Sequence, residues 1–503
     1  MLPKPVYKHL IPALLAGLAL RLLLIWQFPF ASGDTPYYEE LARNWLHHGV
    51  YGFLLDGHLI PSDVRMPGYP GFLAIIYFFA GTGRNAVFLT QAFIDLATCI
   101  LTAFLAARLA VGASDPVRSR IIIAALWLSA LCPFTANYAA VPLTEVLTIF
   151  LTTLAILVFV HPSAYELDLI RDRNALLRSV RSWFLGGLFV GLATLVRPET
   201  PLLLCSVLLV FWRRWWRPLN WGKLAVASLW MTVGVLVPLV PWAARNAHTF
   251  GRVEFLAPRY AQSFGQSVPT GFYAWTQTWM FRSRDAYLSS WKLPVDPIAL
   301  NDLPAYAFDS PEERSRVASL LESYNTERGM TTQVDLGFRR LARERSRRHP
   351  LRSYVWIPTK RAAAMWFTPR IALLPYAGTI WPLSDGWHRG STGFGITLGL
   401  ALLNFLYVGL ACLGVLYWRE SPGIALIVAI IVIRTAFLTQ IQTCEPRYVL
   451  VCFPALLALG AQSWRRYPRR LAHSETSGIS SARLSITLPA CGEHEMRYPR
   501  NQS

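Results

Sequence analysis

The chain has 503 residues, of which 53% are hydrophobic and only 15% are charged, and its mean hydropathy is +0.34. Soluble domains carry about 25% charged residues, so this composition excludes an ordinary soluble domain and indicates a surface largely solvated by lipid. The net charge of +19 would suit a nucleic-acid partner, but the basic residues form short clusters between apolar runs, as positive-inside topology requires. We therefore attribute the charge to membrane topology and expect no nucleic-acid partner.

Apolar runs long enough to span a bilayer, for which about 20 residues are needed, recur along the chain. The first, from about 9 to 30, exceeds the roughly 7 to 15 residues of a signal-peptide core, so we expect a retained helix. The stretch 183–212 is too long for one crossing and is interrupted by Arg197-Pro198, which predicts a tight hairpin of two helices. Further runs lie near 85–111, 120–137, 145–160, 223–241, 393–418, 422–441 and 448–463. The sequence thus predicts an all-α integral membrane protein with about ten spans.

Clusters of arginine set the expected orientation. They all fall on one side of the membrane only if the apolar stretch 67–79 is re-entrant or surface-lying and does not cross. These clusters lie at 118–120, 171–181, 213–223 and 465–470. We therefore expect a multi-pass protein of the plasma (inner) membrane with both termini in the cytoplasm. The outer face would then hold 31–65, 138–144, the turn at Arg197, 243–392 and 442–447.

Four domains follow from this reading of the chain. Residues 1–242 form an N-terminal transmembrane module that includes the first outer loop, 31–65, and residues 393–470 form the C-terminal transmembrane helices. The segment 243–392 has many charges and no run able to span, which predicts a partly helical extracytoplasmic domain. Within it, the mixture of Arg and Trp between 339 and 370 suits a helix at the level of the lipid headgroups. The Ser-rich tail, 471–503, is expected to be disordered and cytoplasmic.

The first outer loop contains the most prominent acidic residue of the outer face. Asp34 follows the end of the first span, Gly33 frees the backbone before it, and Pro36 suits the first turn of the next helix. One explanation is that Asp34 caps this helix through its side chain. The other is that its carboxylate takes part in catalysis, and the two explanations are compatible.

Several short motifs occur in a fixed order along residues 1–463. They are Asp34 with Tyr37-Tyr38, Arg65 to Pro70, Leu143-Thr144-Glu145, Gly191 to Pro198, Pro241 to Asn246 and Glu445 to Tyr448. In this order they resemble the protein O-mannosyltransferase and aminoarabinose-transferase group of GT-C glycosyltransferases, including rhizobial galacturonosyltransferase-like proteins. The resemblance implies a GT-C bundle of roughly 10 to 13 helices, an outward-facing site and a polyprenyl-phosphate-linked sugar donor.

The resemblance also implies a catalytic residue. In that family an Asp of the first outer loop acts as the base, and the matching position is Asp34. Many GT-C enzymes have two adjacent acids there, whereas Asp34 is followed by Thr35, so a divalent metal is left open and no cofactor is assigned. His47, His48 and His58 share this loop but do not have the spacing of a metal site.

The chemistry of such a transfer can be argued from the residues themselves. A hydroxyl group is a poor nucleophile, so a carboxylate should accept its proton as it attacks the anomeric carbon. The phosphate leaving group gains negative charge, which guanidinium groups can bind bidentately. We predict Arg197, Arg245 and Arg447 at the donor phosphate, with snorkelling or structural ion pairing as the alternative for each.

Supporting roles are expected nearby. Glu145 could hold the acceptor, pair with an arginine or help to bind a metal, or be a simple interface carboxylate. Tyr37, Tyr38 and Tyr69 could stack on a sugar, although aromatic residues at this depth are usually membrane-belt residues. Arg21 lies inside the first span, where an unpaired charge is costly, so it should face protein or water.

The sequence therefore predicts a glycosyltransferase that moves a sugar from a polyprenyl-phosphate carrier to a hydroxyl of a protein, a lipid or an envelope glycan. A multi-span transporter or lipid flippase is the main alternative, and a structural protein of the envelope is another. Against transport stand the lack of visible repeats and the position of Asp34 in an outer loop rather than at mid-membrane. The sugar, the acceptor and the carrier length are not readable from residue spacing.

Overall fold

The computed structural model describes residues 4–161, 173–215, 221–258, 268–293, 296–327, 329–376, 390–417 and 421–466. The chain from Met1 to Arg465 forms one compact unit. The predicted disordered tail, 471–503, lies outside the described residues, as does part of the basic cluster at 171–181.

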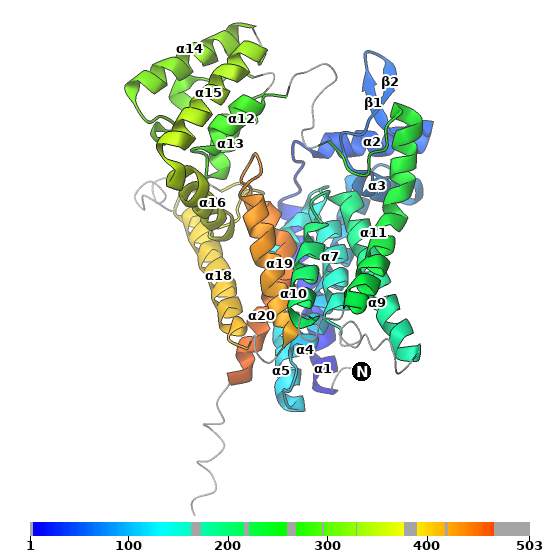
Figure 1. The fold of residues 1–503 in the computed structure, drawn as a ribbon. Coiled ribbons are helices and arrows are strands. Elements are labelled where there is room, and N and C mark those ends of the chain that lie inside the picture. The colour runs from blue at the N-terminus through cyan, green and yellow to red at the C-terminus, as the bar shows by residue number, and fades with distance from the viewer. Residues whose placement is uncertain are drawn as a thin grey trace, which may run out of the picture. The chain divides into compact units, whose positions relative to one another are not determined.

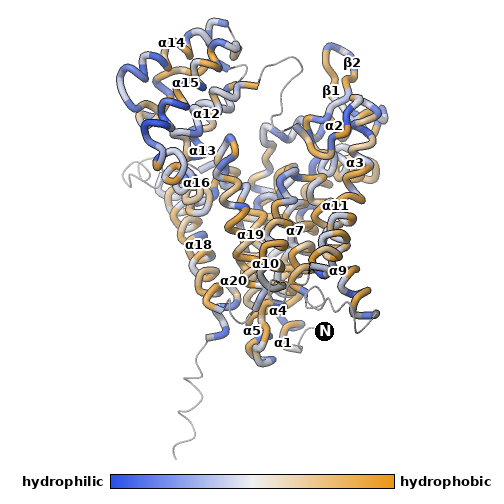
Figure 2. The backbone as a smooth tube through the Cα atoms, viewed as in Figure 1, coloured by the Kyte–Doolittle hydropathy of each residue, from blue (hydrophilic) through white to orange (hydrophobic). Residues whose placement is uncertain are grey.

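Helices long and apolar enough to cross a membrane dominate the fold (Figures 1 and 2). The described residues contain five such spans, in α1 (Lys4–Gln27), α4 (Arg84–Leu109), α9 (Arg173–Val196), α11 (Trp221–Phe250) and α18 (Ser391–Val415). A bent unit adds a sixth, made of α5 (Asp115–Ala130), α6 (Pro133–Ala136) and η1 (Asn137–Ala140). Shorter apolar helices are α3 (Gly68–Ala80), α7 (Glu145–Phe159), α10 (Leu202–Trp215) and α19 (Pro422–Leu438). The predicted multi-span helical membrane fold is therefore confirmed.

The predicted helical hairpin at 183–212 has a clear break in the structure. Helix α9 ends at Val196 and α10 begins at Leu202, with Pro198 and Pro201 between them. Proline lacks a backbone N–H and fixes φ, so a pair of prolines in this link prevents one continuous helix. The break places Arg197 at the end of α9.

Glycines allow α9 and α11 to pack with their backbones almost touching. A Cβ atom added at Gly187 would lie 2.1 Å from the carbonyl oxygen of Met231, and one added at Gly234 would lie 2.2 Å from that of Phe184. Small residues permit such close approach between helices in a membrane, where van der Waals packing drives association. This contact fixes α9, and with it the position of Arg197.

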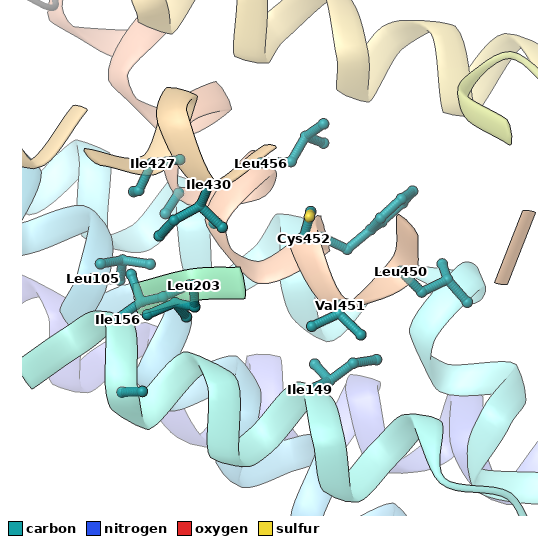
Figure 3. Close-up of a cluster of buried hydrophobic side chains, with 14 of the residues drawn as sticks. Leu105, Ile149, Ile156, Leu203, Ile427, Ile430, Leu450, Val451, Cys452 and Leu456 are labelled. Carbon is teal, nitrogen blue, oxygen red and sulfur yellow. The ribbon is translucent and has the colours of Figure 1, made fainter. Parts of the chain in front are cut away.

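The last apolar run, predicted as one span near 448–463, is not a regular α-helix. It consists of the 3₁₀ segment η5 (Pro446–Cys452), the short helix α20 (Phe453–Gly460) and the 3₁₀ segment η6 (Ala461–Arg466). Figure 3 shows Leu450, Val451 and Cys452 among buried side chains of neighbouring helices. Irregular backbone is tolerated at membrane depth when protein surrounds it, and every residue of α20 is buried. This packing anchors the segment that carries Arg447.

Arg21 is paired inside the first span, as predicted. Its Nε and Nη2 donate to Asp95 Oδ2 at 2.9 and 2.6 Å, and Nη1 donates to the carbonyls of Gly17 and Ala130. The guanidinium is fully buried, so these bonds satisfy a charge that lipid could not solvate. Arg21 therefore joins α1 to α4 and α5.

The loop 31–65, which the sequence predicts to be the first outer loop, contains α2 (Thr35–His48) and a β-hairpin, formed by β1 (Gly52–Leu55) and β2 (His58–Pro61) in antiparallel register. The all-α prediction missed this hairpin. Its turn is Asp56-Gly57, with φ of 49° and 80°, and positive φ at both central residues is the geometry for which Asp-Gly is favoured. Helix α3 packs against α2, and both lie at the end of the bundle opposite the N-terminus (Figure 1).

A second group of helices lies at that same end of the bundle, and it is mostly hydrophilic in Figure 2. It contains α12 (Thr270–Gln277), α13 (Ser283–Leu288), α14 (Pro311–Glu327) and α15 (Thr332–Arg348) around an aromatic core of its own. The π-helix η4 (Arg352–Trp356) and α16 (Ile357–Trp366) follow. The expected domain boundary at 242 falls inside α11, which continues to Phe250.

Candidate active site

Eight charged side chains from distant parts of the sequence form a continuous series of ion pairs, called here the charge cluster. Acids and arginines alternate along it, so the charges are balanced four to four and each buried charge has a partner of opposite sign. The cluster consists of Asp34, Arg65, Glu145, Arg197, Glu199, Arg434, Glu445 and Arg447.

Asp34 lies at the exposed end of this series. It occupies the N-cap position of α2, but its side chain makes no capping hydrogen bond. The carboxylate instead faces two arginines, with Oδ1 at 3.1 Å from Arg65 Nη2 and Oδ2 at 3.3 Å from Arg447 Nη2. The backbone N–H of Asp34 donates to Ser32 Oγ, which helps to fix the turn before α2. Capping therefore does not account for the orientation of the Asp34 side chain.

The electrostatic surroundings keep Asp34 ionised. Burial would raise the pKa of its carboxyl group, but the positive charges of Arg65 and Arg447 and their hydrogen bonds outweigh burial and lower the pKa below its ordinary value. Its side chain is still 31% exposed. An ionised carboxylate that solvent or a ligand can reach is a chemically competent proton acceptor.

Arg447 connects the two arms of the cluster. Its Nε lies 2.6 Å from Glu445 Oε2 and 3.8 Å from Glu145 Oε1, and Arg447 lies shortly before the buried segment Val449 to Gly460. Tyr448 donates a hydrogen bond to Glu445, which holds that carboxylate beside the guanidinium. The position of Arg447 is therefore set both by its neighbours in sequence and by the bundle core.

Arg197 and Glu145 are almost completely buried and retain unused hydrogen-bonding capacity. Arg197 Nη2 lies 3.3 Å from Glu145 Oε1, and its guanidinium lies over the ring of Tyr448. Among the described residues, Arg197 Nη1 has no acceptor and Glu145 Oε2 has no donor. Buried unpaired groups are rare in proteins and commonly mark a place where a ligand or water binds.

Arg245 does not join the charge cluster. It lies on α11 and donates to the carbonyl oxygens of Ser62 and Tyr51 at 2.9 and 2.8 Å, and to Asn246 Oδ1. Its guanidinium also lies over the rings of Tyr51 and Trp242. Of the three arginines predicted to converge on one phosphate, the structure brings Arg197 and Arg447 together through Glu145, whereas Arg245 holds the base of the β-hairpin.

The three predicted tyrosines differ in their surroundings. Tyr38 and Tyr69 meet edge to face with ring centroids 5.2 Å apart, and Tyr69 is fully buried with its hydroxyl donating to Gln91 at 2.8 Å. Burial, with the negative charge of Asp34 nearby, raises the pKa of Tyr38 to about 12. Tyr37 is half exposed and packs edge-on against Phe53. Of the three tyrosines, Tyr37 has the most exposed side chain, whereas Tyr69 is buried and packs against Tyr38.

The described residues contain no group of three or more His, Cys, Asp or Glu side chains arranged to hold a metal ion. In the charge cluster an arginine stands between each pair of neighbouring carboxylates, for example Arg447 between Asp34 and Glu145. Guanidinium groups thus occupy the positions at which a cation would bind these carboxylates.

Comparison with known proteins gives matches among solved structures only: no protein-family model and no curated protein matches the sequence. The oligosaccharyltransferase of Archaeoglobus fulgidus, tethered to an acceptor peptide with the NVT sequon, aligns at a TM-score of 0.50 and 13% identity over 91% of this chain and 49% of that one. Oligosaccharyltransferase AglB of the same organism, in complex with an inhibitory peptide and dolichol-phosphate, aligns at a TM-score of 0.48 and 12% identity over 91% of this chain and 50% of that one. ArnT from Cupriavidus metallidurans, bound to undecaprenyl phosphate, aligns at a TM-score of 0.38 and 13% identity over 90% of this chain and 77% of that one.

The chain has the GT-C fold. It spans about half the length of the archaeal oligosaccharyltransferase chains. The fold that the sequence motifs predicted is therefore confirmed, although identities this low concern the fold alone. In this fold, the charge cluster lies where the loop 31–65 meets the ends of several bundle helices.

The sequence motifs predict a role for only half of the charge cluster. Arg65 and Glu445 lie in motifs named above but have no predicted role, and Glu199 follows Arg197-Pro198 directly. Arg434 could have been found by a different signal, because it is the lone charge in the apolar run 422–441 and such a charge must find a partner. Its Nη2 lies 3.0 Å from Glu199 Oε1.

Proposed function

We propose that the chain is a membrane glycosyltransferase, which transfers a sugar from a polyprenyl-phosphate-linked donor to an acceptor hydroxyl on the extracytoplasmic face. The observation that carries the proposal is the direct contact of Asp34 with Arg447, which shares Glu145 with Arg197. A proton acceptor and two anion-binding groups therefore lie within one site. The GT-C fold supports it, since enzymes that transfer glycans share that fold.

Arg447 and Arg197 are the proposed ligands of the donor phosphate. Arg197 Nη1 is buried and has no acceptor among the described residues, so it is available to a phosphate oxygen. Guanidinium groups bind phosphate oxygens through charge-assisted hydrogen bonds and stabilise the charge that develops as the sugar departs. A carrier lipid would place its phosphate at the polar end of the bundle and its chain along the apolar helices (Figure 2).

Donor binding would also prepare Asp34 for catalysis. A phosphate that takes up the guanidinium of Arg447 competes with the carboxylate for the same N–H groups. Asp34 Oδ2 would then be released, while Arg65 still holds Oδ1 and keeps the carboxylate oriented. The freed oxygen is the proposed general base.

The reaction requires only the chemistry of these groups. The acceptor oxygen attacks the anomeric carbon, the bond from that carbon to the phosphate oxygen breaks, and the proton of the hydroxyl passes to Asp34. Polyprenyl phosphate leaves as an anion paired with Arg447 and Arg197. Glu145 Oε2, which has no donor among the described residues, is proposed to accept a hydrogen bond from a hydroxyl of the bound sugar or acceptor, and Tyr37 and Tyr38 to contact a sugar face.

The proposed location follows from the charge bias of the loops. The active site would lie on the extracytoplasmic side of the plasma (inner) membrane, with both termini in the cytoplasm. Segment 243–392 would then be an extracytoplasmic domain beside the site, and a protein, a lipid or an envelope glycan would be the acceptor.

The test is a donor-cleavage assay with the purified full-length chain. Polyprenyl-phosphate donors that carry different radiolabelled sugars are incubated with an envelope fraction that supplies acceptors, and free polyprenyl phosphate is measured. A glycosyltransferase releases the carrier and moves the label into the acceptor fraction. A transporter or flippase reconstituted in vesicles would move the donor across the membrane and leave it intact, and that result would overturn the proposal.

A further inference from the structure

A cavity of about 550 Å³ lies where the hydrophilic helices meet the bundle. Residues of α12, α15, η4 and α16 line it, together with Thr439 and Gln440 at the end of α19. No residue of the charge cluster lines it. Its described lining contains three arginines, Arg343, Arg347 and Arg361, and neither aspartate nor glutamate. The cavity is thus a cationic site distinct from the candidate active site.

Arg361 is the buried cation of this cavity. It is only 1% exposed, and its Nε and Nη1 donate to the carbonyl oxygens of Met280, Thr439 and Ile441 at 2.8 to 2.9 Å. Its Nη2 has no acceptor among the described residues. Burial lowers the pKa of Arg361, and the charges of Cys444 and Asp285 oppose that effect without outweighing it. Within the described part of the chain Arg361 forms no ion pair, so its buried guanidinium, held by neutral carbonyls, could accommodate an anion.

The mouth of the cavity carries further unpaired charge. Arg343 and Arg347 stand four residues apart on α15, so both project from the same helix face. Both are exposed, and neither has an ion pair within the described part of the chain. The hydroxyl of Ser353, which lines the cavity, is also buried and has no hydrogen-bond partner among the residues that the structure describes. Two like charges at this spacing repel one another, and an anion between them would remove the repulsion.

The surroundings of the cavity indicate a lipid as the source of that anion. Four large apolar side chains next to it are exposed, namely Leu351 at 77%, Tyr354 at 72%, Val355 at 56% and Trp356 at 57%. They belong to the segment between α15 and α16, and Figure 2 shows the chain changing from the hydrophilic α15 to the apolar α18 in this region. We expect the lipid headgroups to lie at such a change. Amphipathic segments with Trp and basic residues bind at this level of a membrane. A water-soluble anion would not need such an apolar rim.

We propose that this cavity binds the phosphate headgroup of an anionic membrane lipid, with Arg361 as the buried anchor and Arg343 and Arg347 at the mouth. The acyl chains would pass over the apolar rim formed by 351–356. The site does not depend on the proposed transferase activity. It would also attach the hydrophilic helices to the membrane surface through a bound lipid.

The test uses the full-length chain, purified in detergent and titrated with phosphatidylglycerol, with bound lipid counted by native mass spectrometry. Arg361 also holds the turn at 439–441, so its replacement could disturb folding. The test variant is therefore Arg343→Gln/Arg347→Gln, whose exposed side chains form no ion pair within the described ranges. The matched control, Arg340→Gln/Arg348→Gln, removes the same charge from exposed positions of α15 that do not line the cavity.

We expect the test variant to bind phosphatidylglycerol at least about tenfold more weakly than the parent, because two charge-assisted hydrogen bonds are lost. The control should stay within about twofold, since remote exposed charges contribute little. Equal weakening in both variants would show general attraction to basic protein and overturn the site. The proposal would also be overturned if phosphatidylcholine bound as tightly as phosphatidylglycerol, or if inorganic phosphate displaced the lipid at a similar concentration. In either case the anionic lipid itself would not be recognised.

Discussion

Replacing Asp34 by Asn tests the catalytic base directly. The Asp34 side chain makes no capping bond to α2, so the substitution removes no cap. It does remove the negative charge that faces Arg65 and Arg447, but these pairs are partly exposed, and such pairs contribute up to about 1 kcal/mol each. Because Asn keeps the size of Asp, the variant should fold and insert in the membrane like the parent.

The effect on the reaction should be far larger. Loss of a general base typically slows a reaction by about 10² to 10⁴-fold. This corresponds to about 3 to 5 kcal/mol of transition-state free energy, which exceeds any loss of stability expected here. Release of polyprenyl phosphate by Asp34→Asn should therefore drop by at least about 100-fold, while donor binding remains.

Glu40→Gln is the matched control for this measurement. Glu40 lies on the same helix and accepts a hydrogen bond from the backbone N–H of Leu54, which Gln can also accept, and it is not part of the charge cluster. Its transfer rate should stay close to that of the parent. If Asp34→Asn expresses normally and keeps more than about a tenth of parental transfer, Asp34 is not the base, and Glu145 becomes the next candidate.

Three further predictions follow from the site and the topology. Arg447→Lys keeps the charge but loses the planar fork of the guanidinium, so the dissociation constant of the donor should rise by about tenfold or more. Arg245→Lys should leave donor affinity nearly unchanged and lower the melting temperature. Equal effects of the two variants on donor affinity would refute the separation of the two sites. Because the pKa of Asp34 is lowered, its carboxylate stays ionised well below pH 7. The transfer rate should therefore be constant from about pH 6 to 8 and fall only at the acidic pH that protonates Asp34. A loss of activity centred near pH 7 would indicate another base. An impermeant thiol reagent on intact cells should label a cysteine at Ser319, on α14, and not one at Ser163, with the parent as the blank; the opposite pattern would reverse the proposed orientation.

Hydropathy predicts the membrane fold because a helix that crosses lipid must be a long apolar run. It does not predict the backbone of an apolar run that is surrounded by protein. The run at 448–463 has the hydropathy of a span, but Pro454 lies within it, and η5, α20 and η6 take the place of one regular helix. Its irregular backbone is buried by neighbouring helices, which no local window of sequence reveals. The hairpin at 52–61 depends instead on a local signal, its Asp56-Gly57 turn. Hydropathy averaged over the length of a span does not detect a two-residue turn.

The candidate site was partly readable in the same way. The motifs directed attention to Asp34, Glu145, Arg197 and Arg447, which the structure brings into one series of contacts. The pairing itself could not be predicted, because it depends on where α2, α7, α9 and η5 end relative to one another. Arg245 illustrates the limit, since its motif suggested a ligand residue and its tertiary contacts are carbonyl oxygens of the first outer loop.

The position of Arg447 in the chain has a consequence for biogenesis. It is synthesised 413 residues after Asp34, and it takes its place only when η5 and α20 have entered the interior of the bundle. Until then, Asp34 can pair with Arg65, whereas Glu145 and Glu199 have Arg197 as their shared partner. A nascent or truncated chain would thus lack one of the two proposed phosphate-binding arginines, and competence for the proposed transfer would arise only when translation and insertion are complete.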